Sequence, residues 1–376
     1  MLLSEEQMAV RDTARRFAQA ELAPYAQAWD EQEDFPAEVL TRLAQMGFMG
    51  MLVPQEKGGT EAGHLLKTIV AEEIAAGCGA ISTVLNVHDG VCAAVAQFGT
   101  HEQAAEYLPA MLRGELIGAF CLTEPGAGSD TAMLKTRATR VRGGWRLDGT
   151  KSFISNGRRA GLAIVVAITD PGAGTKGFSQ FLVPTGTEGF FVARVEKKMG
   201  QRCSDTAQIV LDGCVVHDSQ VLGPIGNGYA QAIGSLPSAR IAVAAQSIGM
   251  ARSAYEAALE YARHRKAFGQ EIIHHQAVAF RLADMLTQIE VARQYTHHAA
   301  SLVDSGLRAN REASIAKCFA SEMAERVASA AIQTLGGTGY MSGPVERIAR
   351  DVRVCQIYEG TSDIQRLLVS RDLGIR

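Results

Sequence analysis

The pattern of the chain changes twice, and this order limits the possible folds more than any other feature of the sequence. The first third has helical periodicity, beginning where Ser4 and Gln7 are spaced as a helix-capping pair. Short runs typical of strands follow, separated by turns of Gly, Pro and Asp, and the last third is helical again. The sequence therefore predicts an α+β, mainly α protein with three domains, which cover residues 1–115, 116–224 and 225–376.

The middle domain is expected to be antiparallel. Its strand-like runs follow one another without helices between them, which favours an antiparallel barrel or sandwich over a parallel sheet. These runs begin at Trp145 and include Leu162–Thr169, Phe178–Val183, Phe190–Val195 and Ala207–Leu211. The last domain contains four long helical stretches, as in a four-helix bundle. They are Arg240–Arg263, Ile272–Ser305, Arg311–Leu335 and Pro344–Val354.

Charge and composition argue against several kinds of partner. The net charge is -3, with 47% hydrophobic and 20% charged residues, a balance typical of a soluble globular protein. This gives no reason to expect a nucleic-acid or anionic-membrane partner. The N-terminal segment lacks the pattern of a secretory signal, and no stretch approaches the roughly 18 apolar residues needed to span a bilayer. We therefore expect a cytoplasmic protein with no membrane insertion.

The cysteines and histidines do not form a metal-binding pattern. The seven cysteines are scattered and include no Cys-x-x-Cys pair, so we interpret them as reduced and mostly buried. The pairs His274–His275 and His297–His298 have no accompanying carboxylate or thiolate ligands, which favours positions on helix surfaces. No metal site is predicted.

Four segments carry residues suited to ligand binding, although each alone has a plainer structural explanation. The Gly-x-Gly turn in 120–130 could press against a planar or phosphorylated ligand, or be an ordinary turn. The segment 151–157 offers either an aromatic ring for stacking or one buried Phe in a strand. The cations of 263–269 suit a pyrophosphate, or a solvated helix end. The glycines of 333–340 could meet a ligand, or cap a helix.

A fifth segment, 357–366, places Glu359 before a glycine at a break between two helical stretches. A carboxylate held at such a break beside a dry cofactor face can have a raised pKa and act as a base. The alternative is a solvated loop glutamate that precedes a helix capped by Thr361 or Ser362.

Together the five segments resemble the acyl-CoA dehydrogenase family, over essentially the whole chain. Residues 123–130 read TEPGAGSD and residues 358–366 read YEGTSDIQR, both unbroken. Arg-x-x-Phe-Gly at 265–269 and Gln-x-Leu-Gly-Gly at 333–337 lie between them, in the family's order and spacing. The resemblance implies the acyl-CoA dehydrogenase fold: an N-terminal helical domain, a middle β-domain and a C-terminal four-helix bundle.

The resemblance also implies an FAD cofactor and the residues that hold it. In the β-domain these are Phe120, Leu122, Thr123, Gly128, Ser129, Phe153, Ile154 and Ser155. Those that reach the FAD of a partner subunit are Arg265, Phe268, Gln276, Gln333, Gly336 and Gly337, whereas Thr361 and Asp363 touch FAD in their own subunit. The substrate side comprises Ser129, Arg240, Tyr358 and Gly360. Sharing a cofactor in this way implies an obligate oligomer, and the resemblance implies a homotetramer, built as a dimer of dimers.

The implied reaction is α,β-dehydrogenation of an acyl-CoA to the trans-2-enoyl-CoA. Glu359 takes the α-proton, the β-hydride goes to flavin N5, and an electron-transfer flavoprotein accepts the electrons. Ala239 stands where isovaleryl-type members carry their base, which leaves Glu359 as the candidate, and Pro237 replaces a polar residue that helps to hold CoA. The stretch 84–90 is closer to short- and branched-chain members than to long-chain ones.

Two other activities on this fold are kept as alternatives. One is a flavin oxidase that uses oxygen, although acyl-CoA oxidases commonly carry an extra C-terminal domain and nitroalkane oxidation usually places Asp where Glu359 stands. The other is a catalytically silent assembly protein. An NAD-linked Rossmann enzyme is disfavoured, because no segment has the required strand–glycine–helix arrangement.

Overall fold

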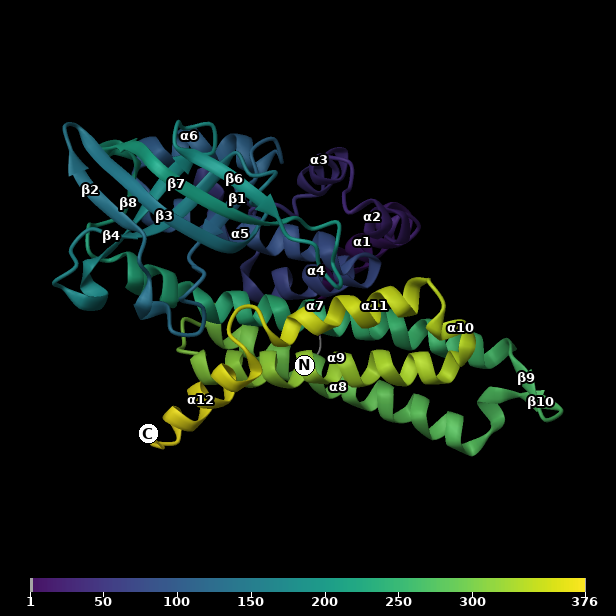
Figure 1. Ribbon diagram of the computed structural model, residues 1–376. Helices are drawn as coiled ribbons and strands as arrows, with labels where there is room; N and C mark the ends of the chain where they lie inside the picture. The colour runs from purple at the N-terminus through teal and green to yellow at the C-terminus, as the bar shows by residue number, and fades with distance from the viewer. Residues whose placement is uncertain (1–2, 376) are drawn as a thin grey trace.

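A computed structural model of the protein describes residues 3–375 and shows a helical domain, a β-domain and a helical bundle in chain order (Figure 1). The first two residues of the predicted N-terminal domain, Met1 and Leu2, and the last residue of the predicted C-terminal domain, Arg376, lie outside the described residues. The β-domain and the N-terminal helices lie along one side of the bundle, whose helices extend far beyond the sheet (Figure 1). The predicted three-part architecture is confirmed.

The described part of the N-terminal domain, from Leu3 onward, contains six α-helices. They are α1 (Glu5–Phe17), α2 (Ala26–Gln32), α3 (Glu38–Gln45), α4 (Gly63–Gly77), α5 (Gly79–Phe98) and α6 (His101–Leu112). The predicted capping box before α1 is confirmed, since the Gln7 amide donates to Ser4 Oγ and the Ser4 amide to Gln7 Oε1. By length and composition α5 could cross a membrane, so the expectation that no stretch approaches this length is wrong. Most of α5 is nevertheless buried inside the protein, as in a core helix.

The β-domain is one eight-stranded sheet. Its strands are β1 (Gly118–Cys121), β2 (Arg137–Val141), β3 (Gly144–Ser155), β4 (Leu162–Ile168), β5 (Phe178–Pro184), β6 (Phe190–Val195), β7 (Thr206–His217) and β8 (Val221–Leu222). The order is β6-β7-β3-β2-β4-β5-β8, with β1 beside β4. The predicted antiparallel pairing holds for most neighbours, but β4 pairs with both β1 and β2 in parallel, so the sheet is mixed.

The C-terminal domain is built on α7, α8, α9 and α11. Its elements are α7 (Gly228–His264), β9 (Lys266–Ala267), β10 (Gln270–Glu271), α8 (Gln276–Asp304), α9 (Asn310–Leu335), α10 (Gly337–Tyr340), α11 (Pro344–Val352) and α12 (Ser362–Asp372). Small side chains allow α7 to approach α4 closely, because a Cβ added at Gly249 would lie 2.1 Å from the Glu72 carbonyl oxygen. α7 begins 12 residues before the predicted start and runs through Pro237.

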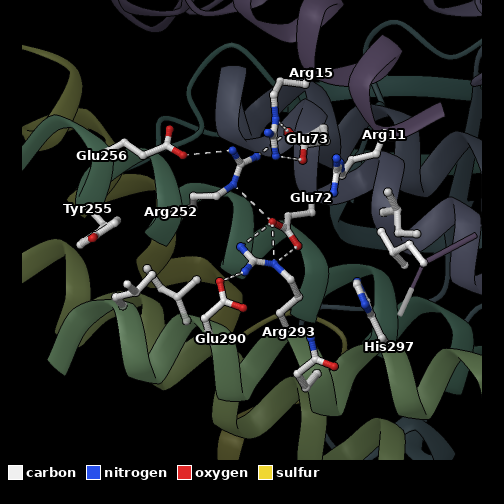
Figure 2. Close-up of a pocket in the computed structure, with 15 residues that line it drawn as sticks. Arg11, Arg15, Glu72, Glu73, Arg252, Tyr255, Glu256, Glu290, Arg293 and His297 are labelled. Carbon is white, nitrogen blue, oxygen red and sulfur yellow. Dashed lines mark hydrogen bonds and ion pairs between the residues drawn. The ribbon is translucent and has the colours of Figure 1, made fainter. Parts of the chain in front are cut away.

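An ion-pair cluster fastens the N-terminal domain to the bundle (Figure 2). Glu73 on α4 is 2.8 Å from Arg15 of α1 and 2.5 Å from Arg252 of α7. Its neighbour Glu72 is 2.9 Å from Arg293 of α8. Both carboxylates are buried, so solvent screens the pairs less than it would on the surface, although Arg15 is partly exposed. Together the pairs connect four helices.

These side chains line a cavity of about 410 Å³. His297 also lines it and is buried, so the helix-surface position predicted for this histidine is wrong; neither of its ring nitrogens has a hydrogen-bond partner within residues 3–375. In the same part of the chain, no three His, Cys, Asp or Glu side chains are grouped as metal ligands. The cysteines are free and, except for the half-buried Cys318, buried, as predicted.

Candidate active site

Glu359 lies in a tight turn between η7 (Arg353–Gln356) and α12. Its φ is 54° and that of Gly360 is 89°, so two successive residues have left-handed backbone conformations. This conformation is uncommon for a non-glycine residue and persists only where surrounding contacts hold it. The Ile364 amide donates to Thr361 Oγ1 at 3.3 Å, which confirms the predicted cap of α12. The turn and the helix cap therefore fix the position of the Glu359 backbone, from which its side chain extends.

Side chains from two helices hold this turn. Gln365 of α12 donates through Nε2 to the carbonyl oxygens of Glu359 at 3.1 Å and Gly360 at 2.8 Å. Lys317 of α9 donates through Nζ to the same Gly360 oxygen at 2.7 Å. Neither residue was predicted as part of the site. A signal for Lys317 was present in the sequence, because this lysine interrupts the alanine face of α9 that includes Ala313 and Ala320.

The charges around Glu359 act in opposite directions. Burial raises the pKa of Glu359, whereas the nearby cations Arg240 and Lys317 lower it, and the net effect is a raised pKa. Arg240, on α7, is buried, and burial lowers its pKa from the usual guanidinium value. Its Nε has no hydrogen-bond partner within residues 3–375. A buried donor without a partner is costly, so the position of Arg240 calls for an explanation other than folding.

The predicted ligand loop after β1 is rigid at its start. Glu124 and Ala127 exchange two backbone hydrogen bonds of 3.1 Å, which close the turn. The Glu124 carboxylate is buried, pairs with Lys151 Nζ at 2.8 Å, and accepts from the backbone amides of Lys135 and Thr136. Sequence reasoning missed this pair, whose members are 27 residues apart. It holds the Gly-x-Gly turn against β3.

Phe153 projects from β3 rather than into the sheet. The register of β3 on β7 shifts between Lys151 and Ile154, and Phe153 has a φ of 59° and is 66% exposed. A bulge of this kind re-aims a side chain, which rules out the alternative of a buried strand Phe. The neighbouring Ser152 amide donates to the Thr123 carbonyl at 2.9 Å, so the bulge and the ligand loop lie together.

The other predicted β-domain residues differ in how a ligand could reach them. Phe120, Leu122, Thr123 and Ser155 are half-buried, whereas Gly128 and Ser129 are exposed. The Ile154 side chain is buried in the β-domain core, which leaves its backbone for any ligand contact. Asp363 is exposed at the start of α12, and Tyr358 lies beside Glu359 with its hydroxyl in a hydrogen bond to Gln246.

A second group of predicted cofactor residues lies at the far end of the bundle. Arg265 and Phe268 are in or beside the β9–β10 hairpin, and Gln276 begins α8 (Figure 1). Gln333, Gly336 and Gly337 are at the α9–α10 junction, next to that hairpin in Figure 1. Arg265 directly follows the last residue of α7 and is 25 residues beyond Arg240, which corresponds to about 37 Å along the helix axis. The structure therefore does not bring this group to Glu359 within one chain.

The exposed hairpin end is suited to an intermolecular contact. Phe268 is 97% exposed and has a φ of 53°. An open groove of about 510 Å³ lies beside it, lined by Ala257, Glu260, Tyr261, His264, Arg265 and Leu335. The cavity in Figure 2 is a different feature, because Arg252 lies 12 residues, or about 18 Å, along α7 from Arg240.

The chain matches known proteins over nearly its full length. Family models described as the acyl-CoA dehydrogenase N-terminal, middle and C-terminal domains match residues 4–115, 119–214 and 226–374. An acyl-CoA dehydrogenase of Bacillus subtilis is 40% identical over 375 residues, which cover 99% of each chain.

The chain belongs to the acyl-CoA dehydrogenase family. A protein of Anaerotignum propionicum named acryloyl-CoA reductase (NADH) is also 40% identical, over 99% of this chain and 95% of its own. The structure of butyryl-CoA dehydrogenase from Megasphaera elsdenii matches with a TM-score of 0.96 at 34% identity and covers 99% of both chains. As a member of this flavoprotein family, the protein is an oxidoreductase that acts on acyl-CoA.

Proposed function

We propose that this acyl-CoA dehydrogenase uses FAD to convert a short-chain or branched acyl-CoA to the trans-2-enoyl-CoA, with Glu359 as the base. The setting of Glu359 carries the proposal. The Glu359 side chain extends from a backbone turn that is held in place. Burial raises the pKa of its carboxyl group, and the cations Arg240 and Lys317 face it. A carboxylate with a raised pKa accepts a carbon-bound proton more readily than a solvated one.

The residues present fit FAD on the β-domain side. Phe153 offers an exposed ring held outward by the β3 bulge, and the loop glycines Gly126 and Gly128 have open space where a Cβ would project. Thr361 and the half-buried Ser155 supply hydroxyls at the other predicted contacts. When bound, FAD supplies the acceptor for the β-hydride, and its electrons would pass to an electron-transfer flavoprotein.

This chain's own residues would prepare the substrate for proton removal. Ser129 and Arg240 would bind polar groups of the acyl-CoA, while Gly360 allows the backbone to approach it. Donors to the thioester carbonyl stabilise the charge that develops as the α-proton leaves. Glu359 would accept that proton, and Tyr358 would limit water on one side of it.

A ring of hydrogen-bonded polar side chains, buried except for the half-buried Tyr358, supports a short or branched acyl chain. Tyr358 donates to Gln246 Oε1 at 2.7 Å, and Gln246 Nε2 donates to Thr83 Oγ1 at 2.6 Å. Thr83 in turn donates to Gln201 Oε1 at 2.6 Å, and Gln201 Nε2 donates back to the Tyr358 hydroxyl at 3.5 Å, which closes the ring. The ring begins one residue from Glu359, and opening it would leave buried polar groups unpaired. We propose that it closes the acyl end of the site.

We also propose a homotetramer in which the hairpin end of one subunit completes the FAD site of another. A bulky exposed side chain with a left-handed backbone, such as Phe268, is expected where a partner or ligand contacts it. The groove beside Arg265 is open to such a contact. Light scattering coupled to gel filtration of the holoenzyme measures the assembly, and a monomer that retains FAD would contradict it.

The principal test is Glu359→Gln, which removes the base but keeps the size of the side chain. The variant should retain FAD and bind acyl-CoA, yet lose at least about 100-fold in the rate of anaerobic flavin reduction. Arg113→Met, at an exposed site in the N-terminal domain, serves as the control and should reduce flavin normally. Near-normal reduction by Glu359→Gln would show that the base is elsewhere.

A substrate panel tests the acyl chain and the alternatives. Butyryl-, isobutyryl- and 2-methylbutyryl-CoA should bleach the flavin at about 450 nm, and palmitoyl-CoA should not. Rapid turnover with oxygen alone would favour the oxidase, and a protein without flavin absorbance would favour the assembly protein. Because one relative is named a reductase, oxidation of reduced enzyme by enoyl-CoA should also be measured. Preferential turnover in that direction with NADH would reassign the physiological reaction.

A further inference from the structure

Lys317 occupies a costly position for a lysine. Its side chain is fully buried on α9, among residues such as Ala316 and Ala320. Lys151, the other fully buried lysine, is compensated by an ion pair with Glu124 at 2.8 Å. Lys317 instead donates to a carbonyl oxygen, at Gly360. Because burying an ammonium without a counter-charge in contact costs several kcal/mol, the position calls for an explanation.

The carbonyl that Lys317 contacts belongs to the turn that carries Glu359. The Gly360 oxygen accepts from Lys317 at 2.7 Å and from Gln365 at 2.8 Å, so two helices hold one peptide group. Gln365 also donates to the Glu359 oxygen at 3.1 Å. Gly360 cannot be replaced without strain, since its φ is 89° and an added Cβ would lie 2.7 Å from Gln365 Nε2. The direction of the Glu359 side chain therefore depends on both donors.

Lys317 also contributes charge. Glu359 faces Arg240 from α7 and Lys317 from α9, and both lower its pKa against the effect of burial. Lys317 itself faces Glu359, Arg240 and the thiols of Cys318 and Cys355. Burial raises the pKa of both thiols, so they are neutral near pH 7. Burial lowers the pKa of Lys317 to about 8, which leaves it mostly charged at neutral pH.

We propose that Lys317 is a positioning residue for Glu359: it fixes the Glu359–Gly360 turn through the Gly360 carbonyl and supplies one of the two positive charges that keep the carboxylate ionised. This inference rests on the proposed role of Glu359 as the base. Gln365 shares the first task but not the second, because its amide carries no charge. The two residues can therefore be separated by experiment.

The test compares Lys317→Met with Gln365→Met. Both variants lose donors to the turn, and only the first loses charge. The rate of anaerobic flavin reduction by butyryl-CoA, or by whichever acyl-CoA bleaches the wild type, is measured against pH. In Lys317→Met the acidic limb should move up by about one pH unit, because an opposite charge near a carboxyl lowers its pKa by about that amount or more. In Gln365→Met the maximal rate should fall while the limb stays in place.

The outcomes separate the inference from the proposed function. Flavin absorbance, acyl-CoA binding and melting temperature are measured on each variant, so that a change of fold is recognised. If Lys317→Met does not retain FAD, Lys317→Gln replaces it, with the same expected shift. An acidic limb that coincides with the wild type overturns the role of Lys317. A wild-type enzyme whose flavin is bleached by no acyl-CoA would instead overturn the proposed function.

Discussion

Replacing Lys151 with Met should destabilise the protein by about 3 to 5 kcal/mol, the usual cost of breaking a buried ion pair from one side. Lys151 donates to Glu124 at 2.8 Å and to the Leu122 carbonyl at 3.0 Å. The substitution leaves that carbonyl without this donor, at a cost of about 1 to 3 kcal/mol. It also leaves Glu124 buried without its counter-charge, although the amides of Lys135 and Thr136 still donate to it.

The assay is equilibrium unfolding in urea, with and without saturating FAD, because bound cofactor adds its own stabilisation. Arg113→Met is a matched control: it breaks the pair with Glu115, whose members are 59% and 57% exposed, and should cost less than about 1 kcal/mol. If unfolding is irreversible, inactivation half-lives at one temperature replace the midpoints.

Lys151→Met should also change cofactor binding. The pair holds the start of the loop from Thr123 to Asp130, so Lys151→Met should weaken FAD binding as well as stability. A loss of stability no greater than that of Arg113→Met would refute the buried-pair argument. Unchanged FAD affinity with reduced stability would confine the role of the pair to folding.

Two further changes test the packing of the domains. Glu72→Gln removes the buried carboxylate that pairs with Arg293 and Arg252. It should lower the free energy of unfolding by about 3 to 5 kcal/mol. A urea unfolding midpoint equal to that of the wild type would contradict this. Burial lowers the pKa of His88 to about 4, so its contribution to stability is complete above about pH 6.5 and decreases by about 3 kcal/mol as the pH falls to 4. His88→Asn should flatten this part of the pH–stability curve, and an equal slope in both proteins would count against the buried neutral ring.

Most helices could be predicted because their ends carry local signals. Ser4 and Thr361 cap helices where the sequence indicated them. The first 12 residues of α7 were missed because Pro237 reads as a helix breaker. Proline removes one backbone hydrogen bond, and tertiary packing of a 37-residue helix can outweigh that loss. Local propensity contains no information about that packing.

The parallel pairings could not be predicted for a different reason. β1 and β4 are each short apolar runs, and the sequence of neither strand indicates which strand it pairs with. Their pairing joins Gly118 to Leu162, across a segment that contains β2 and β3. A strand pattern defines which faces are buried but not which strand lies alongside. The mixed sheet is thus a property of the assembled domain.

The residues of the candidate site also fall into two groups: those that share one sequence motif and those that only packing brings together. Glu359 and Thr361 lie in one continuous motif and were predicted together, whereas Lys317 precedes Glu359 by 42 residues. Its relation to the turn exists only once α9 packs beside it. The same holds for Lys151 and Glu124, which have separate places in the sequence and one buried contact in the structure.

The opposing effects on Glu359 explain why two cations are placed beside it. Burial alone would favour the protonated acid, and a protonated carboxyl cannot accept the α-proton. Close contact with cations alone would favour the carboxylate but make it a weaker base. Arg240 and Lys317 lower the pKa without cancelling the effect of burial, because the net shift remains upward. Lys317 directs its hydrogen bond to the Gly360 carbonyl, so it adds charge near the carboxylate while leaving the carboxylate oxygens free for the substrate.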